Sequence, residues 1–274
     1  DIEQRLLPQS PELAVDLLEG FLGTVDSVFG RADDSGGSIG AVYAEATQAW
    51  LKAAAACPPN SADWLSRIEA LYASSDYGVL DELLPNADKL LNEQQLRQLA
   101  SRYEKRLRAA VAHHSGDWHL PYPALSESVA MGMVARALRD PALYERALLI
   151  RQPNINSLQM ADLCNAFFEF GHPKAAWKYL SQPWDSRDSE RQRLLLRFYE
   201  LTGNREAMTA TARSQFMHAP SEHAYICWVE LIEQDALENA RKDALARVRQ
   251  GDLDLYALLP LLLTLDQDDE AEAQ

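Results

Sequence analysis

Three histidines lie within seven residues and could serve as metal ligands. His113, His114 and His119 share a segment with a glycine and two prolines. Imidazole nitrogens bind zinc. A zinc site also needs side chains that converge on the ion, and usually a carboxylate or fourth ligand that surrounding residues hold in place by hydrogen bonds. On a helix, His113 and His114 would point about a quarter-turn apart. We therefore expect no metal site, and interpret the segment as a helix end followed by a linker that Trp118 and Tyr122 anchor.

An acidic, glycine-rich loop at residues 33–38 offers a second possible site. Its carboxylates could hold a cation, and its glycines could approach a phosphate. No Lys or Thr follows at the spacing of a P-loop, and the spacing of an EF-hand is also missing. We interpret the loop as a turn that ends one helix and caps the next, with Ser38 at the start of the second helix.

Glu169 and His172 have the spacing of one Glu-x-x-His fragment of a di-iron site. That chemistry needs two such fragments on facing helices and two further carboxylates. Only one fragment is present, and Gly171 and Pro173 flank the histidine at a turn, so we reject this interpretation. The sequence also contains no nucleophile elbow, P-loop, dinucleotide fingerprint or His-Glu-x-x-His motif. No catalytic residue and no cofactor is assigned.

The charge balance narrows the range of partners. The 274 residues include 26 basic and 41 acidic side chains, a net charge of −15. A surface this acidic repels a phosphate backbone, so nucleic-acid binding is not expected. The three cysteines lie far apart in the sequence and suggest a reducing, cytoplasmic location. The longest apolar run, residues 258–265, is short and interrupted by Pro260, so no membrane span is expected.

A spacing of 32 residues organises the second half of the chain. Two turn-like glycines, Gly171 and Gly203, lie at this interval, and so do apolar positions in the helices before them. Leu and Ala dominate the composition while β-branched residues are sparse, which favours helix throughout. The chain is therefore predicted to be all-α, an α-α superhelix of stacked helical hairpins.

This pattern resembles the tetratricopeptide (TPR) repeat class. The matching residues are Leu163, Phe167, Gly171 and Ala176, then Leu195, Tyr199 and Gly203. The pattern departs from the class at Met208, at Asp235 and in its period, which is about 34 residues in the class. The resemblance implies a solenoid whose groove is lined by the first helix of each hairpin.

Asn165, Arg193 and Arg197 fall near groove-facing positions of this alignment. An Asn side chain could bond the backbone of an extended peptide, and an Arg could pair with a carboxylate. The alternative is that both arginines only keep a charged helix soluble, since exposed Arg is common on helices.

Three regions follow from these patterns: an irregular helical-hairpin region at 1–116, a TPR-like region with a capping helix at 117–265, and an acidic tail at 266–274. All of the helical regions are expected to form one continuous solenoid. Within the first region, a helix from Glu12 toward Phe29 places Leu13, Leu17 and Phe21 on one apolar face. A long helix from residue 93 is expected to be capped by Asn92.

The whole chain is also similar to an uncharacterised bacterial domain family that lies C-terminal to SWIM-type zinc-finger segments. The similarity rests on residues 41–46, which follow the Asp-Asp-Ser-Gly turn, and on residues 199–207. The zinc ligands of that segment are missing here. Since the chain opens with Asp1 instead of Met, we expect it to be one part of a larger polypeptide.

Together these features predict a protein–protein interaction scaffold with a protein or peptide partner. The alternative is an enzyme, or a protein that binds a small ligand or metal, with its site between the two helical halves near residues 113–122.

Overall fold

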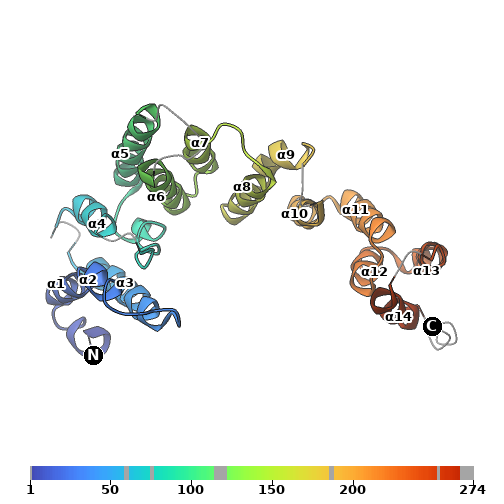
Figure 1. Cartoon of the computed structure of the whole chain (residues 1–274), viewed down its shortest axis with the longest axis horizontal. Coiled ribbons are helices and arrows are strands. Elements are labelled where there is room, and N and C mark those ends of the chain that lie inside the picture. Colours follow the sequence, from blue (N-terminus) through green and yellow to red (C-terminus); the bar gives the residue numbers. More distant parts are fainter. Residues whose placement is uncertain are drawn as a thin grey trace. The chain divides into compact units, whose positions relative to one another are not determined.

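A computed structural model describes residues 2–58, 62–74, 77–113, 122–184, 188–251 and 254–265. Within these ranges every regular element is a helix and no strand occurs, so the predicted all-α class is confirmed (Figure 1). The chain divides into two compact units, Asp1–Ile155 and Asn156–Gln274. They are called the N-terminal unit and the C-terminal unit below. The region boundary predicted at residues 116–117 and the acidic tail both lie outside the described residues.

The N-terminal unit consists of helices joined mostly by short connections. Its elements are η1 (Ile2–Leu6), α1 (Pro11–Leu22), α2 (Val25–Phe29), α3 (Ser38–Ala56), α4 (Trp64–Tyr72), η2 (Ala87–Lys89), α5 (Glu93–Ala112), α6 (Tyr122–Leu138) and α7 (Pro141–Arg151). Helix α1 packs on α3, and α6 packs on both α5 and α7.

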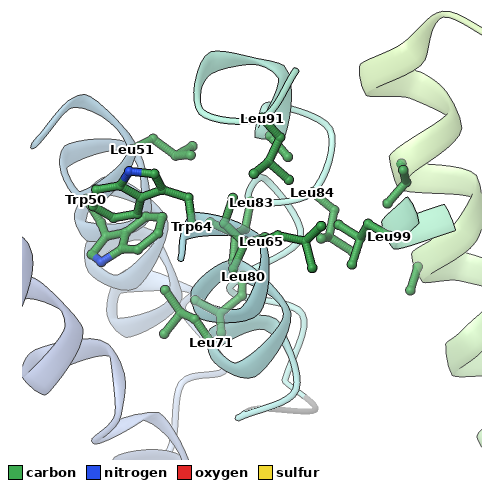
Figure 2. Close-up of a cluster of buried hydrophobic side chains, with 14 of the residues drawn as sticks. Trp50, Leu51, Trp64, Leu65, Leu71, Leu80, Leu83, Leu84, Leu91 and Leu99 are labelled. Carbon is green, nitrogen blue, oxygen red and sulfur yellow. The ribbon is translucent and has the colours of Figure 1, made fainter. Parts of the chain in front are cut away.

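The core of this unit lies among α3, α4, α5 and the segment between α4 and α5 (Figure 2). Trp50 of α3 and Trp64 of α4 meet edge to face, with ring centroids 6.1 Å apart. The connecting segment has little regular structure, yet Leu80, Leu83 and Leu84 are buried on it. Burial of these three leucines keeps this stretch fixed against the helices.

The C-terminal unit continues as helices that follow one another in pairs. Its elements are α8 (Ser157–Glu169), α9 (Pro173–Leu180), α10 (Asp188–Thr202), α11 (Arg205–His218), α12 (Glu222–Val229), η3 (Gln234–Ala236), α13 (Leu237–Val248) and α14 (Leu255–Thr264). Helix α10 packs on α8, α9 and α11, and α12 packs on α11, α13 and α14. Phe216, Tyr225 and Trp228 form an aromatic core between α11 and α12.

Polar side chains at the helix N-termini explain where several helices begin. Asn92 accepts a hydrogen bond from the Gln95 N–H at 3.0 Å, and the Gln95 side chain accepts one from the Asn92 N–H, so the predicted cap is confirmed. Such a reciprocal pair satisfies two backbone donors that the helix leaves unpaired.

Ser38 begins α3, as predicted, but its side chain does not supply the cap. Ser38 is the first residue of α3, and the carboxylate of Asp34 accepts from the N–H groups of Ile39 and Gly40 at 2.8 Å each. Gly37 precedes the helix with a φ of 70°, a left-handed conformation that favours glycine. The loop therefore caps a helix, as expected, but one of its carboxylates does the capping.

The predicted helix from Glu12 toward Phe29 is divided between Leu22 and Val25. Leu13 and Leu17 lie on its exposed side, each with about half of its surface accessible. The buried side carries Ala14, Val15, Leu18 and Leu22. Helix α1 has apolar residues on two sides. The side with the smaller side chains at its centre is the buried one, and α1 packs against α3.

Three hairpins turn through the same backbone geometry. Helices α6, α8 and α10 are each followed by a residue with positive φ: Arg139 at 49°, Gly171 at 78° and Gly203 at 70°. The next N–H in each case bonds a carbonyl five residues earlier, as in Asp140 to Ala135 at 3.0 Å. This is the Schellman arrangement, which satisfies carbonyls at a helix C-terminus.

Candidate functional site

Three aromatic side chains gather on the surface of the C-terminal unit. Trp177 of α9 stacks on Phe198 of α10 with ring centroids 5.2 Å apart and an interplanar angle of 24°. Tyr199 lies beside both rings, 6.4 Å from Trp177 and 5.3 Å from Phe198. Stacked and tilted rings at such distances attract one another beyond the area they bury.

The helix periodicity explains why this group faces outward. On α9 the core positions are Ala176, Tyr179 and Leu180, so Trp177 points to the other side and is 44% exposed. Phe198 and Tyr199 are adjacent on α10, and both are only half-buried. An exposed tryptophan stacked on a half-buried phenylalanine contributes less to folding than a core pair would, and such surfaces often mark binding sites.

The rings border a cleft of about 430 Å³. Its lining consists of Lys174, Trp177, Phe198, Tyr199, Asn204 and Ala207. Asn204 is already engaged, because its side chain accepts from the Ala207 N–H at 3.1 Å and caps α11. We call this the aromatic cleft.

The polar groups of the aromatic cleft that lack a partner can all donate a hydrogen bond. Within the described part of the chain, the Lys174 ammonium, the Trp177 indole N–H and the Tyr199 hydroxyl have no hydrogen-bond or ion-pair partner. None of the described residues that line the cleft carries a carboxylate. The site thus combines aromatic surface with positive charge on a chain whose net charge is −15. This chemistry suits an apolar or aromatic side chain that lies next to a carboxylate.

Two of the three predicted groove residues, Arg193 and Arg197, make side-chain contacts within the C-terminal unit. Arg193 forms two hydrogen bonds to Glu190 on the same helix, at 2.6 and 3.1 Å, and these bonds raise the pKa of Arg193. The Arg197 guanidinium lies 5.4 Å from the ring centroid of Phe168 on α8. Asn165 is half-buried on α8. The contact of Arg197 with Phe168 connects α10 to α8, the first helices of two neighbouring hairpins.

The sequence interpretation did not find Trp177 and Phe198. It treated Tyr199 as the equivalent of the core residue Phe167, whereas the structure buries Phe167 and leaves Tyr199 partly exposed. Two signals were available. Phe198 and Tyr199 are adjacent and cannot both occupy the centre of the buried side of α10, and Trp177 directly follows the small, buried Ala176.

Within the described residues, the potential metal ligands and the buried Cys164 form no second candidate site. His113 lies with its Nδ1 2.6 Å from the Ala109 carbonyl oxygen, while His114 and His119 lie outside the described residues. No group of three or more potential metal ligands comes together in the ranges that the structure covers. Burial raises the pKa of Cys164 to about 12, so its thiol stays protonated and unreactive.

No described helix combines the length and the hydrophobicity that crossing a bilayer requires.

The chain is thus an all-α protein of helical hairpins with an exposed aromatic cleft. It belongs to a family described only as a family of unknown function (DUF6880), which matches residues 1–193. The match includes Lys174 and Trp177 and ends before Phe198, Tyr199 and Asn204. No curated protein and no solved structure matches the chain.

Proposed function

We propose that the protein is an interaction scaffold, built from TPR-like helical hairpins, that binds a protein or peptide partner. The observation that carries the proposal is the aromatic cleft. Trp177 leaves 44% of its surface exposed there, beside Phe198 and an unpaired Lys174. Tryptophan and tyrosine are among the residues that contribute most binding energy at protein interfaces.

The hairpin geometry supports a stacked arrangement. Arg139, Gly171 and Gly203 lie 32 residues apart and share one turn conformation. Hairpins of similar size cannot bury their apolar sides alone, and stacking them produces an extended binding surface. In the proposed TPR-like superhelix, Asn165, Arg193 and Arg197 belong to the surface of the first helices.

The partner segment is expected to carry an apolar or aromatic side chain next to Asp or Glu. The side chain packs against Trp177 and Phe198, and the carboxylate pairs with Lys174. Arg193 is a weaker candidate for a carboxylate because Glu190 already occupies the Nε/Nη2 edge of its guanidinium. The cytoplasmic location, the bacterial origin and a place beside a SWIM-type zinc-finger segment in a larger polypeptide are part of the same proposal and remain predictions.

Selection from a random peptide display library tests the proposal, followed by titration of the enriched peptides. We expect enrichment of Trp, Phe or Leu next to Asp or Glu. Trp177→Ala and Lys174→Glu should each weaken binding of a selected peptide. Tyr256→Ala is the matched control, because Tyr256 is 93% exposed on α14 and does not line the cleft. Failure to enrich any peptide, or equal binding by all three variants, would reject the cleft as the interaction site.

A further inference from the structure

A second cavity, of about 520 Å³, lies within the N-terminal unit. Residues of α4, α5, α6 and the segment between α4 and α5 line it, and we call it the N-terminal cavity. Its volume lies in the range of small-molecule sites, which is about 300–1,000 Å³. It is separate from the aromatic cleft and does not depend on the function proposed above.

One wall of the N-terminal cavity is apolar. Tyr122, Leu125 and Val129 follow one another on α6 at spacings of three and four residues, which places them on one side of the helix. All three line the cavity and are among the exposed large hydrophobic side chains. This wall offers a strip of apolar surface to a ligand chain.

The lining of the N-terminal cavity also includes a group of ion pairs. Arg106 of α5 contacts Glu69 of α4 at 2.7 Å and Glu127 of α6 at 3.0 Å. Glu69 also pairs with Arg102 at 2.5 Å, and Arg106 lies 4.6 Å from the ring centroid of Tyr103. The cation in this cavity is therefore already paired with carboxylates on two sides.

Asp81 differs from these groups. It lines the cavity, and among the described residues its carboxylate has no hydrogen-bond or ion-pair partner. Asp81 is an exposed residue, but partial burial of its carboxyl group and the nearby Glu82 raise its pKa, and no cation in the described residues compensates its charge. Gly78 starts the turn that leads to Asp81 with a φ of 74°, and a Cβ at Gly78 would lie 3.3 Å from the Asp81 Oδ2.

The tyrosines complete the site. Tyr103 is almost fully buried. Among the buried side-chain polar atoms of the described residues, its hydroxyl oxygen is the one without a hydrogen-bond partner. The rings of Tyr72 and Tyr103 meet edge to face, 6.5 Å apart, and both residues line the cavity. Aromatic rings attract an ammonium group, and these two tyrosines line the same cavity as Asp81.

We infer that the N-terminal cavity binds a small organic cation, a protonated amine that carries an apolar chain. The ammonium group pairs with Asp81 near the tyrosine rings, and the chain lies along Tyr122, Leu125 and Val129. An anion is disfavoured, because the described lining contains three carboxylates and one guanidinium. A bare metal ion is also disfavoured, since no three ligands converge in the described residues.

Three probes of equal chain length test this inference on the full chain: hexylammonium, hexanol and hexanoate. Ligand-detected NMR titration should show millimolar binding of hexylammonium, weaker binding of hexanol and no binding of hexanoate. Asp81→Asn should weaken hexylammonium binding by about fivefold, the factor expected for loss of one partly exposed charge pair. Asp88→Asn, which removes an exposed carboxylate outside the cavity, should leave it unchanged.

Val129→Trp provides an independent variant, because it fills the apolar wall and keeps Asp81. It should abolish hexylammonium binding while circular dichroism shows the native helix content. The inference is overturned if hexylammonium does not bind, if hexanoate binds equally well, or if Asp81→Asn or Val129→Trp binds like the unchanged protein. None of these results depends on peptide binding at the aromatic cleft.

Discussion

Arg139 occupies after α6 the same turn position that Gly171 occupies after α8. Their φ angles are 49° and 78°, and the N–H groups that follow them bond carbonyls five residues earlier. Glycine adopts this conformation without steric cost, whereas a residue with a Cβ is strained by roughly 1 kcal/mol. The two hairpins thus make the same turn, but at different cost.

Replacement of Arg139 by glycine should therefore stabilise the N-terminal unit. Arg139 is exposed, and its side chain makes no hydrogen bond or ion pair within the described residues, so little is lost with the side chain. We expect the free energy of unfolding to rise by about 0.5–1 kcal/mol, as measured by urea denaturation. A decrease would mean that the Arg139 side chain contributes more than its backbone strain costs.

Alanine substitutions at Gly171 and Gly20 distinguish the effect of backbone strain from that of steric crowding by an added Cβ. A Cβ at either position would meet no atom within 4 Å, but only Gly171 has a positive φ, of 78°. Gly171→Ala should lower the free energy of unfolding by about 1 kcal/mol. Gly20→Ala, inside α1, should raise it by about 0.5–1 kcal/mol, because alanine favours a helix interior. Equal effects of the two substitutions would contradict this account of the turn.

The helical content and the turns of the second half could be predicted because they depend on local sequence. Gly171, Gly203 and the cap Asn92 act within a few residues of their own position. Arg139 was not recognised as a turn residue, because arginine rarely takes positive φ and only the surrounding hairpin imposes it.

The exposed apolar groups could not be predicted, because exposure depends on which elements pack together. Leu17 and Leu18 are adjacent leucines on α1, yet only Leu18 is buried, by contact with neighbouring helices. Asp81 and Tyr122 are 41 positions apart in sequence and meet only at one cavity. Local patterns carry no information on such tertiary contacts.

Glu69 links pH to the stability of the N-terminal unit. Burial alone would raise the pKa of Glu69, but hydrogen bonds from Arg106 and Arg102 outweigh it and hold the pKa below its ordinary value. A lowered pKa in the folded state stabilises the protein above the unfolded pKa, near 4.3, and this stabilisation is lost as pH falls through the folded value.

Glu69→Gln should thus destabilise the protein at neutral pH by about 1–2 kcal/mol, because two arginines lose an ionised partner. The difference from the unchanged protein should shrink as the pH falls well below about 4.3. Denaturant unfolding across this pH range measures the effect. The control is Glu93→Gln, whose carboxylate pairs with Arg97 on an exposed surface and should contribute less than about 0.5 kcal/mol. A difference that stays constant with pH would show that the ionised pairs are not its source.

The cysteines should differ in reactivity toward a thiol reagent. Burial raises the pKa of Cys57 and Cys164, the latter to about 12, and both side chains are enclosed. Cys227 is only partly buried, with its Sγ 3.6 Å from the Nε2 of His223. Because the thiolate is the reacting form, Cys227 should react first in the folded protein. Cys227→Ser should remove this fast phase, and a fast phase that persists would place the accessible thiol elsewhere.

Substitutions of Trp177 and Trp228, which lie in the same unit, test whether Trp177 serves binding or, like Trp228, stabilises the core. Trp228 is 3% exposed and packs against Phe216 and Tyr225, whereas Trp177 is 44% exposed at the aromatic cleft. Trp228→Ala should cost about 3–5 kcal/mol, since it opens a cavity in the core. Trp177→Ala should cost clearly less, roughly 1–2 kcal/mol, because part of its surface never leaves water. If thermal and urea unfolding gave Trp177→Ala the larger loss, the aromatic cluster would be a stabilising element of the fold, and its exposed rings would no longer argue for a partner.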